Sequence, residues 1–151
     1  MNQSLGSVAL YDIIIVFIVI TFSFLTITIN YNKAFRAGSR AVYIIKQNAG
    51  YNQAASNHIR RDLNTLHYPP YPGGVYFNAS SCPIKNGQRA MDTLTSGGPI
   101  STRHEVCVYR FASGTRYYKY GVMTYMYVDL PVVGNIFKVP VYVESDYLHI
   151  F

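Results

Sequence analysis

The residue types that usually carry catalysis or bind metals are dispersed in this sequence of 151 residues. No G-x-S-x-G nucleophile motif or phosphate-binding loop occurs, because Gly73-Gly74 and Gly97-Gly98 follow Pro or Ser and do not open a helix. The sequence therefore predicts a protein that is not an enzyme and binds no cofactor or metal ion. The remaining candidates show neither metal-ligand spacing nor a paired-carboxylate motif: His58, His67, His104, His149, Asp62, Asp92, Glu105, Asp129, Glu144 and Asp146.

Two cysteines, Cys82 and Cys107, offer a different chemistry. They lack the CxxC or Cys/His grouping of a zinc site. In an oxidising compartment we expect them to pair, closing a loop of about 25 residues that stabilises the fold by roughly 3.5 kcal/mol. In a reducing compartment they would be two buried thiols. We favour the disulfide.

A membrane-spanning helix is predicted near the N-terminus. Residues 13–29 are uncharged, and residues 8–11 extend the apolar run to about 22 residues with only Asp12 between them, close to the 20 that a bilayer needs. Residues 1–11 contain no Lys or Arg and no A-x-A site follows, which argues against a cleaved secretory signal. We assign residues 1–30 to a short leader and the transmembrane segment.

Asp12 has an unusual position, because an ionised acid at the edge of an apolar run costs free energy unless it is paired or near the interface. It could be a helix N-terminal acid at head-group depth, favoured by the helix dipole. It could instead pair with a positive group of another subunit, such as a free N-terminus. The sequence leaves both interpretations open.

Basic residues follow the span. Residues 31–61 hold six of them and no acid: Lys33, Arg36, Arg40, Lys46, Arg60 and Arg61. A basic stripe beside a membrane helix most often meets lipid head groups, so we expect Lys33, Arg36 and Arg40 to meet membrane lipid or a neighbouring subunit. Nucleic acid is the alternative, but no nucleic-acid-binding module is visible and we do not expect it.

A helical pattern continues beyond the span. Gly38 and Gly50 weaken it by about 1 kcal/mol each relative to Ala and indicate bends or close approaches. We predict an amphipathic extension over residues 31–68, forming one long helix with the span from about residue 9 to 66, bent near residues 30–40 or 50. Its mainly apolar face recurs at spacings of three, four or seven: Phe35, Val42, Ile45, Ala49, Asn52, Ala55, Ile59, Leu63 and Leu66.

Residues 69–151 predict a small β domain rich in tyrosine, a residue that favours strands and contact surfaces. Pro140 lacks a ladder donor and predicts an edge strand or a bulge. The expected fold class is α+β, with the long helix packed on an antiparallel sheet of 3–4 strands. The expected segments are strands 75–77, 105–111, 116–130 (bent at Gly121) and 136–145, a loop over 79–103, and a short strand or tail over 147–151.

Alternation indicates which side chains of the last two long strands face the core. The four apolar residues Phe137, Val139, Val141 and Val143 share one face of the last strand. In the strand before it, we expect Val122, Met126, Val128 and Leu130 to point to the core.

Two stretches carry a family resemblance: residues 10–16 (LYDIIIV) and residues 128–141 (VDLPVVGNIFKVPV). The chain contains, in this order, an acid, an apolar span, an amphipathic helix and a β domain with one Cys pair. This order of segments resembles that of type IV pilins and, in particular, of TadE-like pseudopilins of Gram-positive bacteria. The resemblance implies a single-pass subunit of a tight-adherence pilus or secretion assembly, which joins other pilin-like subunits or itself through its helix. It also implies cleavage after Gly6, although no basic leader precedes Gly6 and Asp12 would then be sixth where the family has its acid fifth.

The orientation signals conflict. The positive-inside rule would place the C-terminal domain in the cytoplasm, where the basic stripe could meet a cytosolic partner. The expected disulfide, the β domain and the family resemblance favour a cell-membrane protein with an extracytoplasmic domain, and a surface filament after assembly. The alternative function is a single-pass, membrane-tethered binding module that enters no filament.

Overall fold

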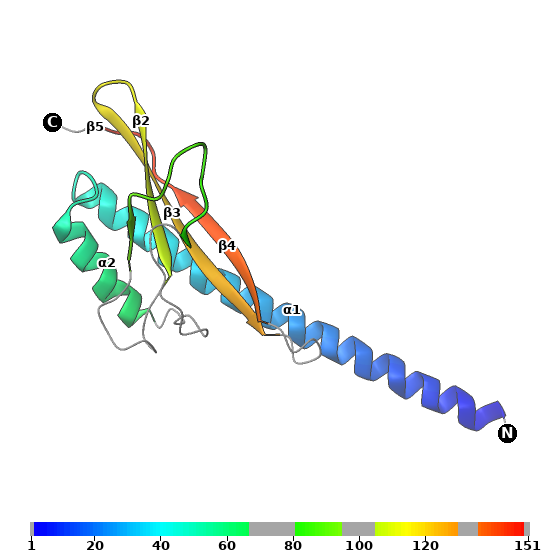
Figure 1. Cartoon of the computed structure of the whole chain (residues 1–151). Helices are drawn as coiled ribbons and strands as arrows, with labels where there is room; N and C mark the ends of the chain where they lie inside the picture. Colours follow the sequence, from blue (N-terminus) through cyan, green and yellow to red (C-terminus); the bar gives the residue numbers. More distant parts are fainter. Residues whose placement is uncertain (1, 67–80, 95–104, 130–135, 150–151) are drawn as a thin grey trace.

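The computed structural model describes residues 2–66, 81–94, 105–129 and 136–149, which fold as α+β. The sheet lies on the C-terminal half of helix α1, whose N-terminal half projects away from the rest of the molecule (Figure 1). This arrangement confirms the predicted fold class. The elements are α1 (Asn2–Gln47), α2 (Gln53–Thr65), β1 (Asp92–Thr93), β2 (Val106–Ser113), β3 (Tyr117–Asp129), β4 (Ile136–Glu144) and β5 (Leu148–His149).

The prediction of one helix from residue 9 to 66 is wrong, because the chain reverses between α1 and α2. Ala49 has a φ of 51° and Gly50 a φ of 139°, values that a right-handed helix does not accommodate. The amide of Gly50 bonds to the carbonyl of Ile45 at 2.9 Å and that of Ala49 to Lys46 at 3.2 Å, a Schellman C-cap. Asn52 then caps α2 by accepting a bond from the amide of Ala55 at 2.8 Å.

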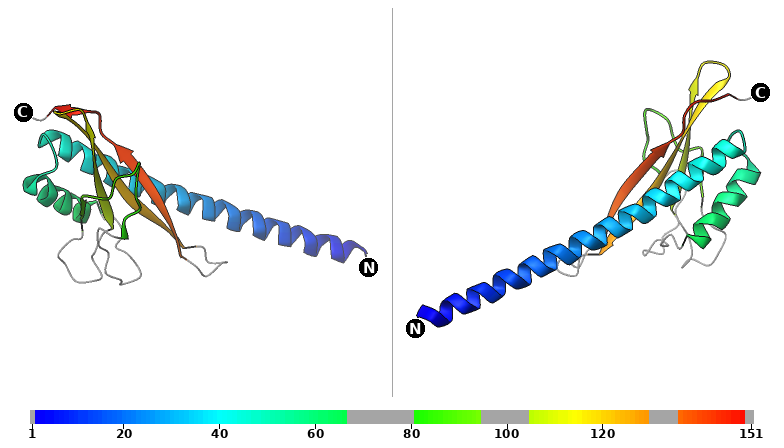
Figure 2. Two further views of the ribbon diagram at one scale, coloured as in Figure 1. Left: turned by 45° about the horizontal axis from the view of Figure 1, so that its top comes forward. Right: turned by 180° about the vertical axis from the view of Figure 1, so that it is seen from behind.

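The reversal also changes which residues form the core. Figure 2 shows α2 folded back beside α1, so two short apolar faces replace the single predicted stripe. Phe35 and Leu66, predicted to face the core, are 45% and 41% exposed. The buried side of α1 includes small residues that a search for large apolar side chains misses: Ala34, Ala37, Gly38 and Ala41.

Small residues allow α1 to approach the sheet closely. A Cβ on Gly38 would lie 3.1 Å from a methyl group of Val143, which confirms a close approach at this glycine. The hydroxyl of Thr124 donates to the carbonyl of Ala34 at 2.9 Å, and the side-chain amide of Asn30 donates from Nδ2 to the carbonyl of Tyr127 at 2.9 Å. The helix is unbroken over residues 30–40, where a bend was expected.

The five strands form an antiparallel sheet in which β1, β2, β3 and β4 are neighbours in this order, and β5 pairs with β3 beyond the end of β4. Pro140 lies opposite Tyr125 on the edge strand β4, as predicted. Strand β1 falls in the segment predicted to be a loop. It is short, and the hydroxyl of Tyr51 holds it by donating to Asp92 at 2.6 Å. The predicted strand 75–77 lies outside the described residues.

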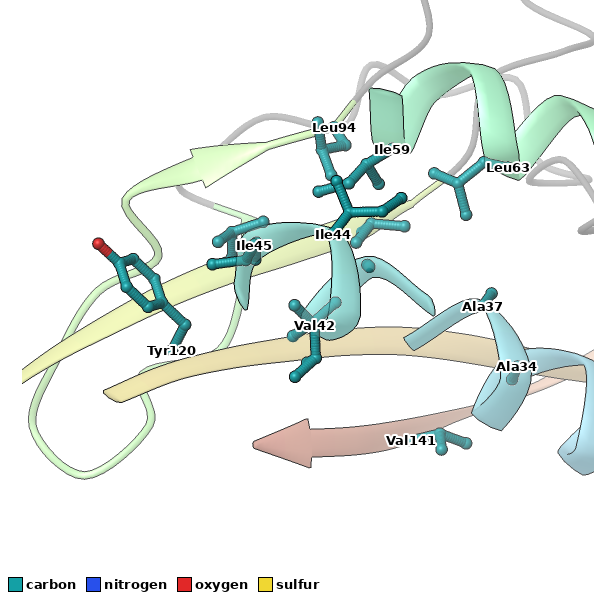
Figure 3. Packing of buried hydrophobic residues seen from close by; sticks show 14 of the residues in the cluster. Ala34, Ala37, Val42, Ile44, Ile45, Ile59, Leu63, Leu94, Tyr120 and Val141 are labelled. Carbon is teal, nitrogen blue, oxygen red and sulfur yellow. The ribbon is translucent and has the colours of Figure 1, made fainter. Parts of the chain in front are cut away.

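The α1 side of the sheet contains the main core. Val122, Met126 and Val128 are buried there as predicted, while Leu130 lies outside the described residues. Near the end of α1, Ile44 and Ile45 meet Ile59 and Leu63 of α2 and Leu94 (Figure 3). On β4, Val141 is buried and Val143 half-buried, but Phe137 and Val139 are exposed, contrary to prediction, because one helix covers β3 more fully than the edge strand.

Candidate membrane anchor and interaction surfaces

The N-terminal half of α1 exposes a continuous apolar surface. From residue 8 to 29 nearly every side chain is exposed, including Ile13 and Phe17 at 69%. These 22 positions span about 33 Å at 1.5 Å per residue, against a bilayer core of about 30 Å. By its length and composition, α1 could cross a membrane once.

The hydroxyl residues of this surface do not interrupt it. Each hydroxyl donates to the carbonyl four residues earlier, at 2.8–3.0 Å, so its hydrogen-bonding capacity is met within the helix. Residues 13–29 can therefore enter hydrocarbon without presenting an unsatisfied hydroxyl group. The hydroxyl residues are Thr21, Ser23, Thr26 and Thr28.

Asp12 and Gly6 both lie on α1. The Asp12 side chain is exposed at the start of the apolar surface, and no described residue forms an ion pair with it. Its role in subunit contact, and cleavage after Gly6, therefore stay predictions.

The basic residues after the span differ in their surroundings. Lys33 and Arg36 are exposed and form no ion pair with the described residues. Arg40 Nε lies 2.7 Å from Asp62 Oδ2 on α2, and its guanidinium lies 5.6 Å from the Tyr43 ring centre. The hydrogen bond to Asp62 raises the pKa of Arg40 above its ordinary value.

An open groove of about 530 Å³ lies between α1 and the C-terminal end of α2. Sequence reasoning missed it, because α2 reaches this place only through the reversal at Ala49 and Gly50. The sequence signal that could have revealed the groove is Gly50, because a glycine at this place can end a helix and need not mark a bend within it. The lining residues are Phe35, Arg36, Ser39, Arg40, Tyr43, Asp62, Thr65 and Leu66.

The predicted disulfide is present on the sheet face that points away from α1. Cys82 and Cys107 are bonded, with their Cα atoms 6.0 Å apart. The bond holds the segment 81–94 over the sheet, where the hydroxyl of Tyr109 also donates to the carbonyl of Pro83 at 2.6 Å. Burial raises the pKa of Tyr109, so this hydroxyl remains a donor.

A buried acid on the same face was not predicted. Glu105 is 3% exposed, accepts a hydrogen bond from Tyr127 at 2.7 Å and pairs with Lys138. The Lys138 ammonium lies 4.0 Å from the ring centre of Tyr125. Because the buried carboxylate of Glu105 has both a cationic partner and a hydroxyl donor, its charge is compensated, and we assign these residues a role in packing.

The predicted site residues therefore fall in separate places: Asp12 on the apolar surface, the basic residues beside the groove, and the cysteines on the far face of the sheet. Among the residues that the structure describes, no three His, Cys, Asp or Glu side chains are grouped to hold a metal ion. No family model matches the chain, and no curated protein or solved structure shows significant similarity to it.

Proposed function

We propose that this chain is a pilin-like structural subunit of the TadE-like pseudopilin type. Helix α1 anchors it in the cell membrane and joins it to itself or to other pilin-like subunits in a pilus or secretion assembly. The observation that carries the proposal is the apolar surface of residues 8–29, which no described part of the chain covers.

That surface is apolar on all sides of the helix, so it needs a cover on all sides. A helix of this kind is stable in lipid or inside a bundle, and not in water. Lipid covers it while the subunit is in the membrane. When a subunit leaves the membrane and enters the assembly, the equivalent helices of neighbouring subunits pack against this apolar surface in place of lipid.

The disulfide supports an extracytoplasmic head, since such bonds persist in oxidising compartments. The test is thiol labelling of intact cells that express the full chain, with and without prior reduction. We expect labelling of Cys82 and Cys107 by a membrane-impermeant maleimide only after an impermeant reductant is added. Thiols that label only after the cells are permeabilised would place the head in the cytoplasm.

Assembly is tested by cross-linking. A cysteine at Phe22, exposed on α1, reports helix proximity in membranes from the same cells. We expect cross-linked oligomers for F22C and a marked loss of them when Asp12→Ala is added, with Asp12→Glu as the control that keeps the charge. Monomers throughout would refute helix-mediated assembly, and unchanged cross-linking with Asp12→Ala would remove the acid from the mechanism.

The alternative is a membrane-tethered binding module, and the end of the sheet farthest from the anchor favours it. Tyr117 packs edge-on against His149 with ring centres 5.1 Å apart, and Tyr147 lies near Lys119. Tyr117 and Tyr147 are both exposed, as contact tyrosines in binding surfaces are. This alternative predicts an anchored monomer, so the cross-linking experiment separates the two functions.

A further inference from the structure

The groove between α1 and α2 lies where α1 leaves its apolar segment. Leu66, at the end of α2, and Phe35, on α1, line the same groove because α2 returns toward the anchor. A volume of about 530 Å³ is in the range of small-ligand sites. The groove is open rather than enclosed, so a ligand can enter it from outside.

The groove carries one uncompensated positive charge. Arg40 is paired with Asp62, and Arg36 has no acidic partner among the described residues. Lys33, one turn earlier, adds a second cation that forms no ion pair within the described part of the chain. An anion is therefore the complementary ligand, and a guanidinium fork matches the oxygens of a phosphate.

The depth of Arg36 fits the head-group layer. It follows Ile29, the last apolar residue of the segment, by seven positions, or about 10 Å along the axis. The head-group region beyond the hydrocarbon core is roughly 5–8 Å thick. Side chains on a helix lean toward its N-terminus, so Arg36 extends back toward the membrane.

The apolar wall of the groove suits the upper part of a lipid. Phe35 and Leu66 are exposed in it, and Tyr31 stacks on Phe35 with ring centres 6.2 Å apart. Aromatic side chains gather at this depth in membrane proteins because one end is apolar and the other is hydrated. A ligand with a charged head and an apolar tail satisfies both parts of the groove.

We propose that this groove binds an anionic phospholipid, with Arg36 contacting the phosphate and Phe35 and Leu66 contacting the glycerol and upper acyl chain. The inference rests on the membrane insertion of α1 proposed above. It turns a general attraction of basic residues for lipid into a site with a defined ligand.

A second copy of the chain is the competing occupant, and Asp12 is the acid it could supply. Asp12 precedes Arg36 by 24 positions, or about 36 Å along the helix. Two parallel copies inserted to the same depth cannot bring these residues together. This spacing favours the lipid over Asp12 of a parallel second copy as the occupant of the groove in the membrane.

The test is native mass spectrometry of the full-length protein in a mild detergent, titrated with phosphatidylglycerol or phosphatidylcholine. We expect wild type to retain phosphatidylglycerol preferentially and Arg36→Gln to bind it about five-fold more weakly, with Arg36→Lys between the two because it keeps the charge and loses the guanidinium fork. Arg116→Gln is the matched control, because Arg116 is exposed in the turn between β2 and β3 and loses the same charge.

Equal retention of the two lipids, or an equal loss in Arg36→Gln and Arg116→Gln, would overturn the site. So would a dimer that both Arg36→Gln and Asp12→Ala abolish, since the groove would then belong to a second copy. None of these three results would contradict the insertion of α1 into the membrane. A full-length protein that stays dissolved without detergent or lipid would instead contradict the proposed function.

Discussion

Removing the disulfide with the double substitution Cys82→Ala and Cys107→Ala should destabilise the head more than any single buried contact. The bond joins residues 25 positions apart. In the chain-entropy model, closing such a loop stabilises the folded state by about 3.5 kcal/mol. For a folded part of this size, that corresponds to a fall in the melting temperature of roughly 10–20 °C.

The measurement is urea and thermal unfolding of the full-length protein in detergent micelles, followed by near-UV circular dichroism of its tyrosines. The apolar half of α1 stays helical in the micelle, so far-UV signal is not the readout. The double variant and the reduced wild type should show the same lowered free energy of unfolding. Agreement between them identifies the covalent bond, rather than the changed side chains, as the cause.

Tyr109→Phe is the matched control, because it removes a non-covalent tie to the same segment, the hydrogen bond to Pro83, and leaves the disulfide intact. We expect it to cost about 1 kcal/mol. A double cysteine variant that unfolds within about 1 kcal/mol of wild type would refute the reasoning, since the segment 81–94 would then be held by packing alone.

Three further predictions concern local contacts. Gly121→Ala should cost about 1 kcal/mol, because a Cβ there overlaps the Tyr142 ring, and the cost should shrink in a Tyr142→Ala background, measured by a double-mutant cycle in urea. Asn52→Ala should cost about 1 kcal/mol through loss of the α2 cap while Asn52→Ser costs little; equal effects would mean that the cap is unimportant. Pairing with Lys119 lowers the pKa of Glu144. The contribution of this ion pair to the free energy of unfolding is therefore present above the ordinary pKa of a glutamate and is lost as the pH falls through the lowered value. As the pH falls below the ordinary pKa of a glutamate, wild type should lose more stability than Lys119→Met, and parallel pH profiles would contradict the pairing.

The sequence predicted the strands well because alternation reports burial directly. Val122, Met126 and Val128 are where the two-residue period places them. The same rule failed for Phe137 and Val139, because alternation defines a face but not how far a single helix covers it.

The helices were harder to predict for two physical reasons. Ala49 adopts a left-handed conformation that glycine usually supplies, so the stop signal of Gly50 lies one position late and suggested a bend instead of a helix end. The sheet-facing side of α1 depends on small residues such as Ala34 and Gly38, whose contribution is close approach rather than apolar area. The groove could not be predicted without the reversal, although two of its basic residues, Arg36 and Arg40, were identified.

The unbroken course of α1 bears on how the protein works. The helix continues from the apolar surface into the core, and Asn30 and Thr124 fasten it to the sheet where the span ends. The head and the anchor therefore move together, and a shift of α1 along its axis displaces the whole head by the same amount. A tethered binding module benefits from a flexible linker, which lets it search for its ligand. A subunit that is placed in an ordered assembly by its helix benefits from the rigid connection found here.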